Sequence, residues 1–310
     1  MPDTHAPRVA AVVVNWRRPQ ATRAALAALA EVGAPGCFPV VVENGSADFT
    51  DAELARTPGG RRVVSASNVG FAAGANLGMR AALDAGAEWV WFVNDDAAPE
   101  PGALATLLAA AALPPHPQVL GPKIVQADHP ERLDSVAVTL DLASGAMRLL
   151  GHDEVDGGQY DALGYAPLAV SGCALLVSRR ACLQLGGFEE AYFAYFEDID
   201  LCLRARLAGM HVAAVPAARV RHDRPPTTAG RQSPSSLYYS VRNHLVVVAL
   251  FCPQPPWLTR LRSLRILGRY LSFAALRSGA AAPAALRAVR RGVQDYQRGA
   301  MGAAPADLGD

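Results

Sequence analysis

The sequence predicts an α/β fold in which a mostly parallel β-sheet is flanked by helices. Between Arg8 and Ala97, short apolar runs rich in Val alternate with segments rich in Ala and Leu, and short polar links join them. Unbroken apolar runs are typical of strands that are buried on both faces of a parallel sheet. The 310 residues with 51% hydrophobic content are enough for one large domain with appendages.

The elements of this first half follow one another in a regular order. We expect strands at residues 8–14, 38–42, 62–65 and 90–93. We expect helices at residues 21–30 and after Asn76, up to about Ala85. Gly and Pro residues at 33–36 end the first helix, and a turn rich in Asn and Gly follows the second strand at 43–48.

The fourth strand is followed by the strongest chemical signal. Asn94, Asp95 and Asp96 come directly after its apolar run. Ligands of open α/β sheets bind beyond the carboxyl ends of the strands, so this carboxylate pair is suited to hold a hard cation and, through it, phosphates. The same residues, ahead of Pro99 and Pro101, are also typical of an ordinary turn. The segment alone leaves both interpretations open.

Two common phosphate-binding loops are missing from the sequence. No Gly-x-Gly-x-x-Gly follows the first strand, which disfavours a dinucleotide dehydrogenase. No Gly-x-x-x-x-Gly-Lys-Ser/Thr occurs, which removes the P-loop nucleotide hydrolases. A sheet of this kind needs another way to hold phosphates, and a metal bound by Asp96 would supply it.

Four segments resemble, in their order, the motifs of family 2 glycosyltransferases, which have the GT-A fold: residues 12–19, 42–48, 68–78 and 94–96. Later segments resemble the acceptor half, especially of a rhamnosyltransferase-like branch: residues 171–178, 186–188, 196–206 and Gly209. The resemblance covers about residues 8–245. It implies a Rossmann-like GT-A domain with a nucleotide-sugar-binding half at 1–100, an acceptor-binding and catalytic half at 101–223, and a basic helical C-terminal extension at 224–310.

For the donor, the resemblance implies a set of nucleotide-binding positions. Trp16 stands where an indole can stack on the nucleobase. Glu43 stands where the family usually has an Asp that accepts the imide N–H of the base, and Asn94 stands near the ribose. The full donor set is Val14, Trp16, Glu43, Asn68, Gly70, Phe71, Gly74, Asn76, Asn94 and Asp95.

The resemblance assigns the metal to Asp96, the last residue of the family's Asp-x-Asp motif, with His222 as a further ligand. Mg²⁺ or Mn²⁺ is expected, because both prefer oxygen ligands and the diphosphate of the donor would complete the shell. From the residue alone, a lone histidine fits a structural role equally well.

Residues 197–200 contain three acids at the start of a predicted helix, directly after an aromatic segment. Acids that cap an amphipathic helix would explain this pattern, and so would a sugar-binding cleft with an aromatic wall beside carboxylates. The resemblance makes Asp198 the general base that takes the proton of the acceptor hydroxyl, with Glu197 and Asp200 in support. The acceptor positions it implies are Gly172, Cys173 and Tyr195.

Charge is distributed unevenly along the chain. Residues 1–223 carry 17 Arg and Lys against 25 Asp and Glu, whereas residues 224–310 carry 12 Arg against 3 Asp. In the helix expected at 257–273, Arg262, Arg265 and Arg269 lie opposite an apolar face of Leu261, Leu264, Leu267, Tyr270 and Leu271. A core-facing helix with a solvated Arg face fits this pattern, and so does a surface helix on anionic lipid. No zinc-binding, helix-turn-helix or RNA-binding aromatic pattern accompanies the charge, so nucleic acid is not an expected partner.

Three other segments carry weaker expectations. A strand at 136–140 and a mobile Gly-rich loop at 151–164 indicate a β-excursion, and residues 224–231 look like a linker. In the segment 236–244, the pattern leaves Arg242 between a phosphate contact and a helix cap.

The five cysteines are scattered, and no pair has metal-ligand spacing. The start of the chain lacks a basic n-region with an apolar h-region, and no apolar run reaches the roughly 20 residues that cross a bilayer. We therefore expect reduced thiols in the cytoplasm, with peripheral contact at the inner face of a membrane as an option for the Arg-rich region.

The expected function is that of an inverting, metal-dependent glycosyltransferase, with dTDP-rhamnose as the favoured donor and a glycan, lipid-linked or small-molecule acceptor. A UDP-sugar such as UDP-galactofuranose or UDP-N-acetylglucosamine is the first alternative. A sugar-phosphate nucleotidyltransferase would need a Gly-rich signature with Arg and Lys after the first strand, and residues 15–19 lack it. A non-catalytic nucleotide-sugar-binding module would bind a donor without turnover.

Overall fold

The computed structural model describes residues 7–308 except 35, 55, 56, 58, 142, 164–166 and 224–231. Within this part the strands are β1 (Val9–Asn15), β2 (Cys37–Asn44), β3 (Arg61–Ser65), β4 (Trp89–Val93), β5 (Ala97–Pro99), β6 (Val119–Gln126), β7 (Leu133–Ser135), β8 (Ala137–Leu140), β9 (Met147–Leu150), β10 (Ala174–Ser178) and β11 (Val212–His222). The helices are α1 (Pro19–Glu31), α2 (Asp51–Leu54), α3 (Gly70–Asp84), α4 (Ala103–Ala111), α5 (Arg179–Leu185), α6 (Glu197–Leu207), α7 (Pro234–Phe251), α8 (Pro256–Arg277) and α9 (Ala282–Arg298).

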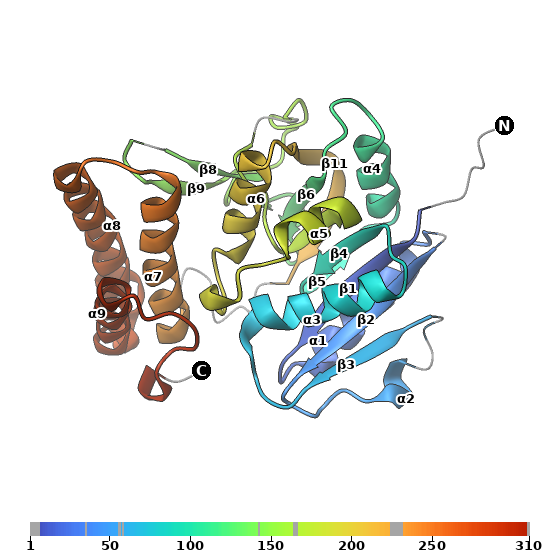
Figure 1. The fold of residues 1–310 in the computed structure, drawn as a ribbon, viewed down its shortest axis with the longest axis horizontal. Coiled ribbons are helices and arrows are strands. Elements are labelled where there is room, and N and C mark those ends of the chain that lie inside the picture. Colours follow the sequence, from blue (N-terminus) through green and yellow to red (C-terminus); the bar gives the residue numbers. More distant parts are fainter. Residues whose placement is uncertain are drawn as a thin grey trace.

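The central sheet has the strand order β3-β2-β1-β4-β10-β6-β11-β5, and β7 pairs with β6. Strands β3, β2, β1 and β4 are mutually parallel, as the sequence predicts. Strand β10 lies antiparallel between β4 and β6, while β11 runs parallel to β6. The sheet is therefore mixed, because β10 and the edge strand β5 run antiparallel to their neighbours. Figure 1 shows α7, α8 and α9 grouped at one side of this sheet.

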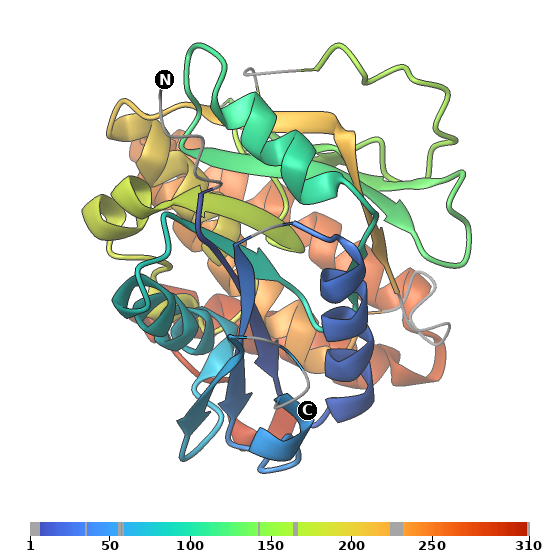
Figure 2. The same cartoon turned by 90° about the vertical axis from the view of Figure 1, so that its right-hand side faces the viewer.

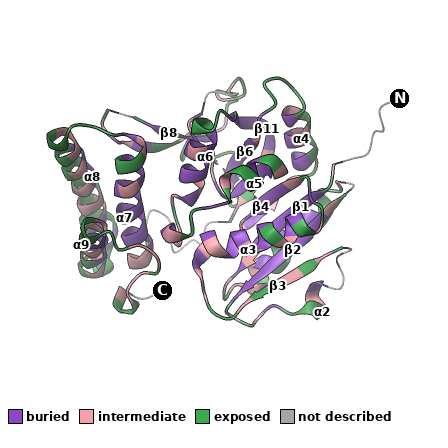
Figure 3. Ribbon diagram, in the orientation of Figure 1, coloured by how far each residue is buried: buried purple, intermediate pink, exposed green. Residues whose placement is uncertain are grey.

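Both faces of the sheet are covered by helices. Along β1, Val9 and Ala11 pack in one apolar cluster with α1 and α4, whereas Ala10 and Val12 pack in another with α3. Figure 2 shows α1 and α4 toward the viewer and the C-terminal helices behind the sheet. The central strands are buried along their length (Figure 3). A strand covered on both faces needs apolar residues at successive positions, which explains the unbroken runs in the sequence.

Helix α3 begins earlier than the sequence pattern suggests. We expected the helix only after Asn76, but it starts at Gly70, inside the motif. The side-chain oxygen of Asn68 accepts the Gly70 N–H at 2.9 Å and so satisfies a donor at the helix start. Gly70 has φ +86°, and a Cβ there would lie 2.5 Å from the carbonyl oxygen of Phe193, so glycine is required.

The C-terminal helices pack on the core that α3 covers, chiefly through apolar residues of α7. On α8, the structure reverses part of the expected pattern. Arg262 is buried and donates to the carbonyls of Ala143 and Cys252, whereas Leu261 and Leu264 are exposed. Of the two alternatives that the sequence left open, a core-facing leucine side with a solvated Arg face does not hold at Leu261, Leu264 and Arg262. The packed side of α8 contains Arg262, Ile266 and Ala274.

The β-excursion expected near residues 136–140 is present as β7, β8 and β9. The polar loop after β9 is tied to the sheet by charged contacts. Lys123 Nζ donates to Asp156 at 3.0 Å and to Asp161 at 2.8 Å, and Arg219 Nη1 donates to Asp156 at 2.7 Å. These contacts anchor the loop at Asp156 and Asp161, and the mobility that the Gly-rich sequence indicates stays a prediction.

The remaining expectations concern the linker, membrane-spanning helices and domain boundaries. The predicted linker at 224–231 lies outside the described residues. None of the helices in the described part combines the length and apolar character that a bilayer crossing needs. The domain boundaries at residues 100 and 223 stay a prediction.

Candidate active site

A large cleft opens at the carboxyl ends of β1 and β4. Its volume is about 1700 Å³, which is well above the roughly 300–1,000 Å³ of a pocket for one small ligand. Its wall takes residues from both halves of the chain and from the C-terminal helices, among them Trp16, Asp95, Asp198, His222 and Tyr270. The cleft is therefore large enough for two substrates.

Asp96 and His222 meet at this end of the sheet. Strands β5 and β11 pair Ala97 with His222, which places the imidazole next to Asp96. His222 Nε2 lies 3.3 Å from Asp96 Oδ1, and its Nδ1 donates to Asp134 Oδ2 at 2.6 Å. The contact with Asp134 fixes the ring so that Nε2 faces Asp96.

The chemistry of this pair fits a divalent cation whose shell is completed by phosphate oxygens. Asp96 Oδ1 is buried and has no hydrogen-bond partner, so it is available to a cation. No group of three or more His, Cys, Asp or Glu side chains within the described ranges is arranged to hold a metal. Two protein ligands are nevertheless sufficient, because Mg²⁺ is commonly held by one or two carboxylates together with substrate phosphates.

Arg18 supplies positive charge at the same place. Its Nη1 donates to Asp95 Oδ1 at 3.1 Å and to Asp96 Oδ2 at 2.9 Å. Burial alone would raise the pKa of Asp96. The contacts with His222 and Arg18 nevertheless hold this pKa below its ordinary value. Burial and the charge on Asp96 raise the pKa of Asp95 to about 6. The two carboxylates are thus unequal, and Asp96 is the more strongly ionised.

Asp198 faces the same cleft from the start of α6. The Gly172 N–H donates to Asp198 Oδ2 at 2.7 Å, and the Ile199 N–H donates to Oδ1 at 2.8 Å. The carbonyl of the next residue, Cys173, accepts the Asn94 N–H at 2.9 Å. Two consecutive residues ahead of β10 therefore join Asp198 to the loop that carries Asp96.

Glu197 and Asp198 form a buried acidic pair. Burial and the charge on Asp198 raise the pKa of Glu197 to about 8. Burial also raises the pKa of Asp198, but the N–H groups of Gly172 and Ile199 favour its charged form. Glu197, with its pKa of about 8, is therefore the member that readily holds a proton, whereas the two N–H donors favour the charged form of Asp198.

The aromatic segment before α6 has a strained backbone. Phe193, Tyr195 and Phe196 have φ values of +67°, +66° and +74°, in the left-handed region that non-glycine residues rarely adopt. Arg242 and Asn243 of α7 are buried and donate to backbone carbonyls of this segment at 2.7 to 3.2 Å. Arg242 therefore has a third role, different from both the phosphate contact and the helix cap that the sequence left open.

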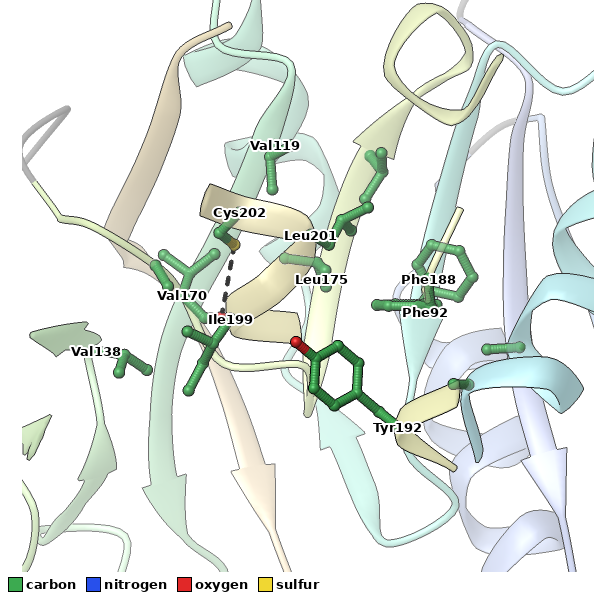
Figure 4. Packing of buried hydrophobic residues seen from close by; sticks show 14 of the residues in the cluster. Phe92, Val119, Val138, Val170, Leu175, Phe188, Tyr192, Ile199, Leu201 and Cys202 are labelled. Atoms are coloured by element: carbon green, nitrogen blue, oxygen red, sulfur yellow. Dashed lines mark hydrogen bonds between the residues drawn. The ribbon is translucent and has the colours of Figure 1, made fainter. Parts of the chain in front are cut away.

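Helix α6 is buried on most of its circumference. Figure 4 shows Leu201 and Cys202 facing the strands, and Cys202 Sγ donates to the Val170 carbonyl at 4.0 Å. Asp200 is buried on another side of the helix, where its carboxylate accepts Arg204 Nε at 2.5 Å. Residues two apart on a helix point roughly 200° apart, so an Asp198 that faces the cleft directs Asp200 inward. The structure thus gives Asp200 a structural contact outside the cleft wall.

A family model described as "Glycosyltransferase like family 2" matches residues 7–244. The chain belongs to this family of glycosyltransferases. Family membership confirms the resemblance seen in the sequence motifs. It also decides against a sugar-phosphate nucleotidyltransferase and a non-catalytic binding module.

Relatives of this glycosyltransferase support the rhamnosyltransferase-like branch. The N-acetylglucosaminyl-diphospho-decaprenol L-rhamnosyltransferase of Mycobacterium tuberculosis is 33% identical over 216 residues, which cover 64% of this chain and 70% of the relative. Galactofuranosyltransferase GlfT1 of the same species is 40% identical over 134 residues, which cover 40% of this chain and 42% of that protein.

A solved structure confirms the GT-A fold. Mannosyltransferase PcManGT from Pyrobaculum calidifontis, in complex with GDP-Man and Mn²⁺, superposes with a TM-score of 0.59 at 16% identity. The match covers 95% of this chain and 88% of that chain, so it includes the C-terminal helices.

Most positions that the motifs imply for substrates of the glycosyltransferase line the cleft. On the donor side these are Val14, Trp16, Asn68, Gly70, Phe71, Asn94 and Asp95. On the acceptor side they are Gly172, Cys173 and Tyr195, together with Glu197 and Asp198. Their contacts with substrates stay predictions.

Glu43 lies outside the cleft wall. It is fully buried, its Oε2 accepts the Phe49 N–H at 2.9 Å, and its Oε1 accepts the Ser46 N–H at 3.0 Å. Asn15 Nδ2 also donates to Oε2 at 2.9 Å. The side chain folds back into the turn after β2, so the structure gives Glu43 a role in that turn instead of an open position at the nucleobase.

Gly74 and Asn76 also lie behind the donor side of the cleft. A Cβ at Gly74 would lie 3.1 Å from a methyl of Val14, so glycine lets α3 approach β1 closely. Asn76 Nδ2 donates to the Phe188 carbonyl at 2.8 Å, and its Oδ1 accepts the Phe188 N–H at 2.9 Å. Because α3 starts at Gly70, the first turn of the helix reaches the cleft and later residues pack inside.

Two polar residues near the metal ligands had not been assigned from the sequence. Arg18 lies in the loop after β1, inside the motif at 12–19. It could have been found from the sequence as a basic residue just after a strand that neighbours β4. Asp134 had no such signal. It lies in the three-residue strand β7, and only the pairing of β7 with β6 and of β6 with β11 brings it to His222.

Gly172→Ala is expected to lower turnover by about 10- to 100-fold, because a displaced catalytic group costs this much. A Cβ at this position would lie 3.0 Å from Asp198 Cβ and 3.1 Å from its Oδ2, so Asp198 must shift. Donor affinity should change little, since the donor positions lie on other elements. The measurement is kcat together with the dissociation constant of the donor.

The matched control is Gly268→Ala on α8, where a Cβ meets nothing within 4 Å. Alanine should keep normal turnover there and favour the helix by about 0.5–1 kcal/mol. Normal turnover in Gly172→Ala would show that the position of Asp198 is not critical.

Proposed function

We propose that this protein is an inverting, metal-dependent glycosyltransferase that moves a sugar from a nucleotide-diphosphate donor to an acceptor hydroxyl. The observation that carries the proposal is that two unlike carboxylate sites meet at one cleft. Asp198 lines the cleft, and Asp96 lies directly behind its wall, in contact with the lining residues Arg18 and His222. Asp96 with His222 is suited to a cation, and Asp198, whose charged form is favoured by two N–H donors, is suited to take a proton. The segment at 172–173 links the two sites through backbone hydrogen bonds.

For the donor, dTDP-rhamnose is favoured. The relative named as an L-rhamnosyltransferase supports rhamnose as the sugar, and the thymidine nucleotide follows from the motif resemblance. UDP-galactofuranose is the second candidate, because GlfT1 is 40% identical over its matched segment. Both donors carry a pyrimidine base that could stack on Trp16, which lines the cleft.

For the acceptor, we propose a hydroxyl on a lipid-linked glycan. The name of the related L-rhamnosyltransferase specifies N-acetylglucosaminyl-diphospho-decaprenol, which is a lipid-linked sugar. A cleft of about 1700 Å³ leaves room for an acceptor sugar beside the donor. The aromatic residues Phe193, Tyr195 and Tyr239 line the cleft near Asp198 and are suited to contact sugar rings.

The reaction is a single displacement. Asp198 accepts the proton of the acceptor hydroxyl, and the acceptor oxygen forms a bond to the anomeric carbon while the bond from that carbon to the diphosphate breaks. Attack from the face opposite the leaving group inverts the anomeric configuration. Glu197, which already holds a proton, keeps a second negative charge away from Asp198.

Asp96 and His222 would hold the Mg²⁺ or Mn²⁺ ion. Bound there, the ion supplies charge neutralisation for the leaving nucleoside diphosphate. Asp134 orients His222 toward this position. Arg18 bridges Asp95 Oδ1 and Asp96 Oδ2, so its guanidinium would lie near the diphosphate beside the ion.

The donor assignment is tested by thermal stabilisation against a panel of nucleotide-diphosphate sugars with Mg²⁺ or Mn²⁺. The largest stabilisation is expected with dTDP-rhamnose and Mn²⁺ or Mg²⁺, and a ligand at 100 times its dissociation constant contributes about 2.7 kcal/mol. A clear preference for uridine donors would support the second candidate. Stabilisation by guanosine donors alone would contradict both, and equal stabilisation without metal would remove the metal dependence.

A further inference from the structure

The outward side of α8 carries an exposed apolar row. Trp257, Leu261 and Leu264 follow one another at helical spacing, and their exposed fractions are 68%, 39% and 65%. These three residues are called the α8 stripe below. Helix α8 lies at the outer edge of the molecule (Figures 1 and 3), and Leu250 at the end of α7 is exposed as well.

The α8 stripe does not result from a shortage of apolar residues elsewhere on the helix. The opposite side packs through Ile266 and Ala274 but also buries Arg262, whose guanidinium donates to two backbone carbonyls. The helix therefore turns an arginine inward and a tryptophan with two leucines outward. Single exposed apolar residues are normal on proteins, whereas a contiguous row indicates an interaction surface.

Positive charge flanks the stripe on both sides. Arg260 and Arg265 are exposed, and α8 contains no acidic residue. In the described stretch 232–308, the acids are Asp295 and Asp307, and Asp295 is buried against Arg291. The described stretch 232–308 around the stripe thus carries an excess of positive charge, and an excess of this kind attracts anions.

We infer that the α8 stripe lies on an anionic lipid surface. Tryptophan and leucine insert at the boundary between headgroups and acyl chains, while flanking arginines contact the lipid phosphates. A second copy of the chain fits less well, because two facing stripes would bring Arg260 and Arg265 of both copies together without acidic partners. Nucleic acid would attract the arginines but leave the apolar row in water.

The α8 stripe and the cleft share one helix. Arg269, Tyr270 and Phe273 line the cleft about one and a half to two and a half turns after the stripe. Arg269 Nη1 donates to the Met147 carbonyl at 3.3 Å. Leu149 of β9 lines the cleft and is also exposed. Docking through α8 would hold this side of the cleft close to the headgroups, where a lipid-linked acceptor presents its sugar. This last link rests on the proposed function, whereas the docking itself does not.

The test is flotation of the full chain with vesicles of phosphatidylcholine alone or mixed with phosphatidylglycerol, without donor or acceptor. The wild-type protein should float with the mixed vesicles at low salt, and less so as salt screens the charges. Arg260→Gln with Arg265→Gln should weaken binding roughly 30-fold, from about 1 kcal/mol for each arginine. Trp257→Ser with Leu261→Ser and Leu264→Ser should lose most of the binding. The matched control replaces Leu113 and Leu183, which are equally exposed on other elements, by Ser and should bind normally.

Three results would overturn the inference. The first is absence of wild-type binding to the anionic vesicles, and the second is normal binding by the triple variant. The third is a dimer in solution that the triple variant abolishes while vesicle binding stays unchanged, since the stripe would then be an interface between copies. All these side chains are exposed, so melting temperatures close to wild type are expected and check that the variants fold.

Transfer to a water-soluble acceptor separates this inference from the proposed function. In the absence of vesicles, the stripe variants should transfer sugar as the wild type does, because the stripe lies outside the cleft wall. Absence of transfer in every protein, with vesicle binding intact, would contradict the proposed function and leave the docking surface standing. Normal transfer without vesicle binding would contradict the docking surface and leave the proposed function standing.

Discussion

Asp96→Asn is expected to abolish tight binding of Mn²⁺ and, with it, of the donor. The Oδ1 atom of Asp96 is buried without a hydrogen-bond partner and lies 3.3 Å from His222 Nε2, so it is the oxygen best placed for a cation. A neutral amide is a much weaker ligand, and its N–H group would point at a cation. We expect a loss of more than about 100-fold in Mn²⁺ affinity, since losing a residue that merely supports a ligand already costs 10- to 100-fold.

The measurement is the concentration of free Mn²⁺ by electron paramagnetic resonance, with and without nucleoside diphosphate. Asp84→Asn is the matched control, because this exposed carboxylate at the end of α3 lies outside the cleft wall. Unchanged Mn²⁺ affinity in Asp96→Asn would show that the metal, if used, binds elsewhere in the protein.

Asp198→Asn is expected to lower turnover by roughly 10²- to 10⁴-fold, because this is the contribution of a general base. Donor binding should stay close to normal. The amide cannot accept the proton of the acceptor hydroxyl, although it can still accept the Gly172 N–H. Glu197→Gln is the control next to it and should cost much less, because the pKa of Glu197 is raised to about 8 and this side chain is already neutral at pH 7.

The same assignment predicts the pH dependence of kcat. A general base must be ionised, and burial raises the pKa of Asp198 above its ordinary value of 3.8. Turnover should therefore fall as the pH drops through this raised pKa, and Asp198→Asn should remove that limb of the profile. Near-normal turnover in Asp198→Asn would remove it as the base, and a product with retained anomeric configuration would defeat the single displacement.

The fold of the first half could be predicted because its physics is local. Strands buried on both faces need apolar residues at successive positions, and β1, β2 and β4 have them. The residues at strand ends were found for the same reason: Asn94, Asp95 and His222 follow or end buried strands and line the cleft. The antiparallel insertion of β10 could not be predicted, because a short apolar run looks the same in a parallel and in an antiparallel strand.

The errors concern which way a side chain points. An acid at a strand end can face the cleft or fold back onto the following turn, and Glu43 does the latter because backbone N–H groups are nearer than any ligand. On α6, the sequence shows three acids in four residues, but it does not show that the helix turns Asp200 inward. On α8, most leucines lie on one face, which the sequence marks as apolar, but the packed side is the one with Arg262, Ile266 and Ala274. Arg262 is buried because backbone carbonyls of other segments accept its guanidinium, and the sequence does not show these partners.

The central claim is that Asp96 and Asp198 do separate jobs in one cleft. Its most direct test is calorimetric titration of nucleoside diphosphate with Mn²⁺ into the two Asn variants, with transfer measured on the same samples. The claim predicts that Asp198→Asn binds the nucleotide like the wild type but transfers little sugar, whereas Asp96→Asn binds neither metal nor nucleotide tightly. Equal loss of nucleotide binding in both variants, or normal transfer by Asp198→Asn, would contradict it.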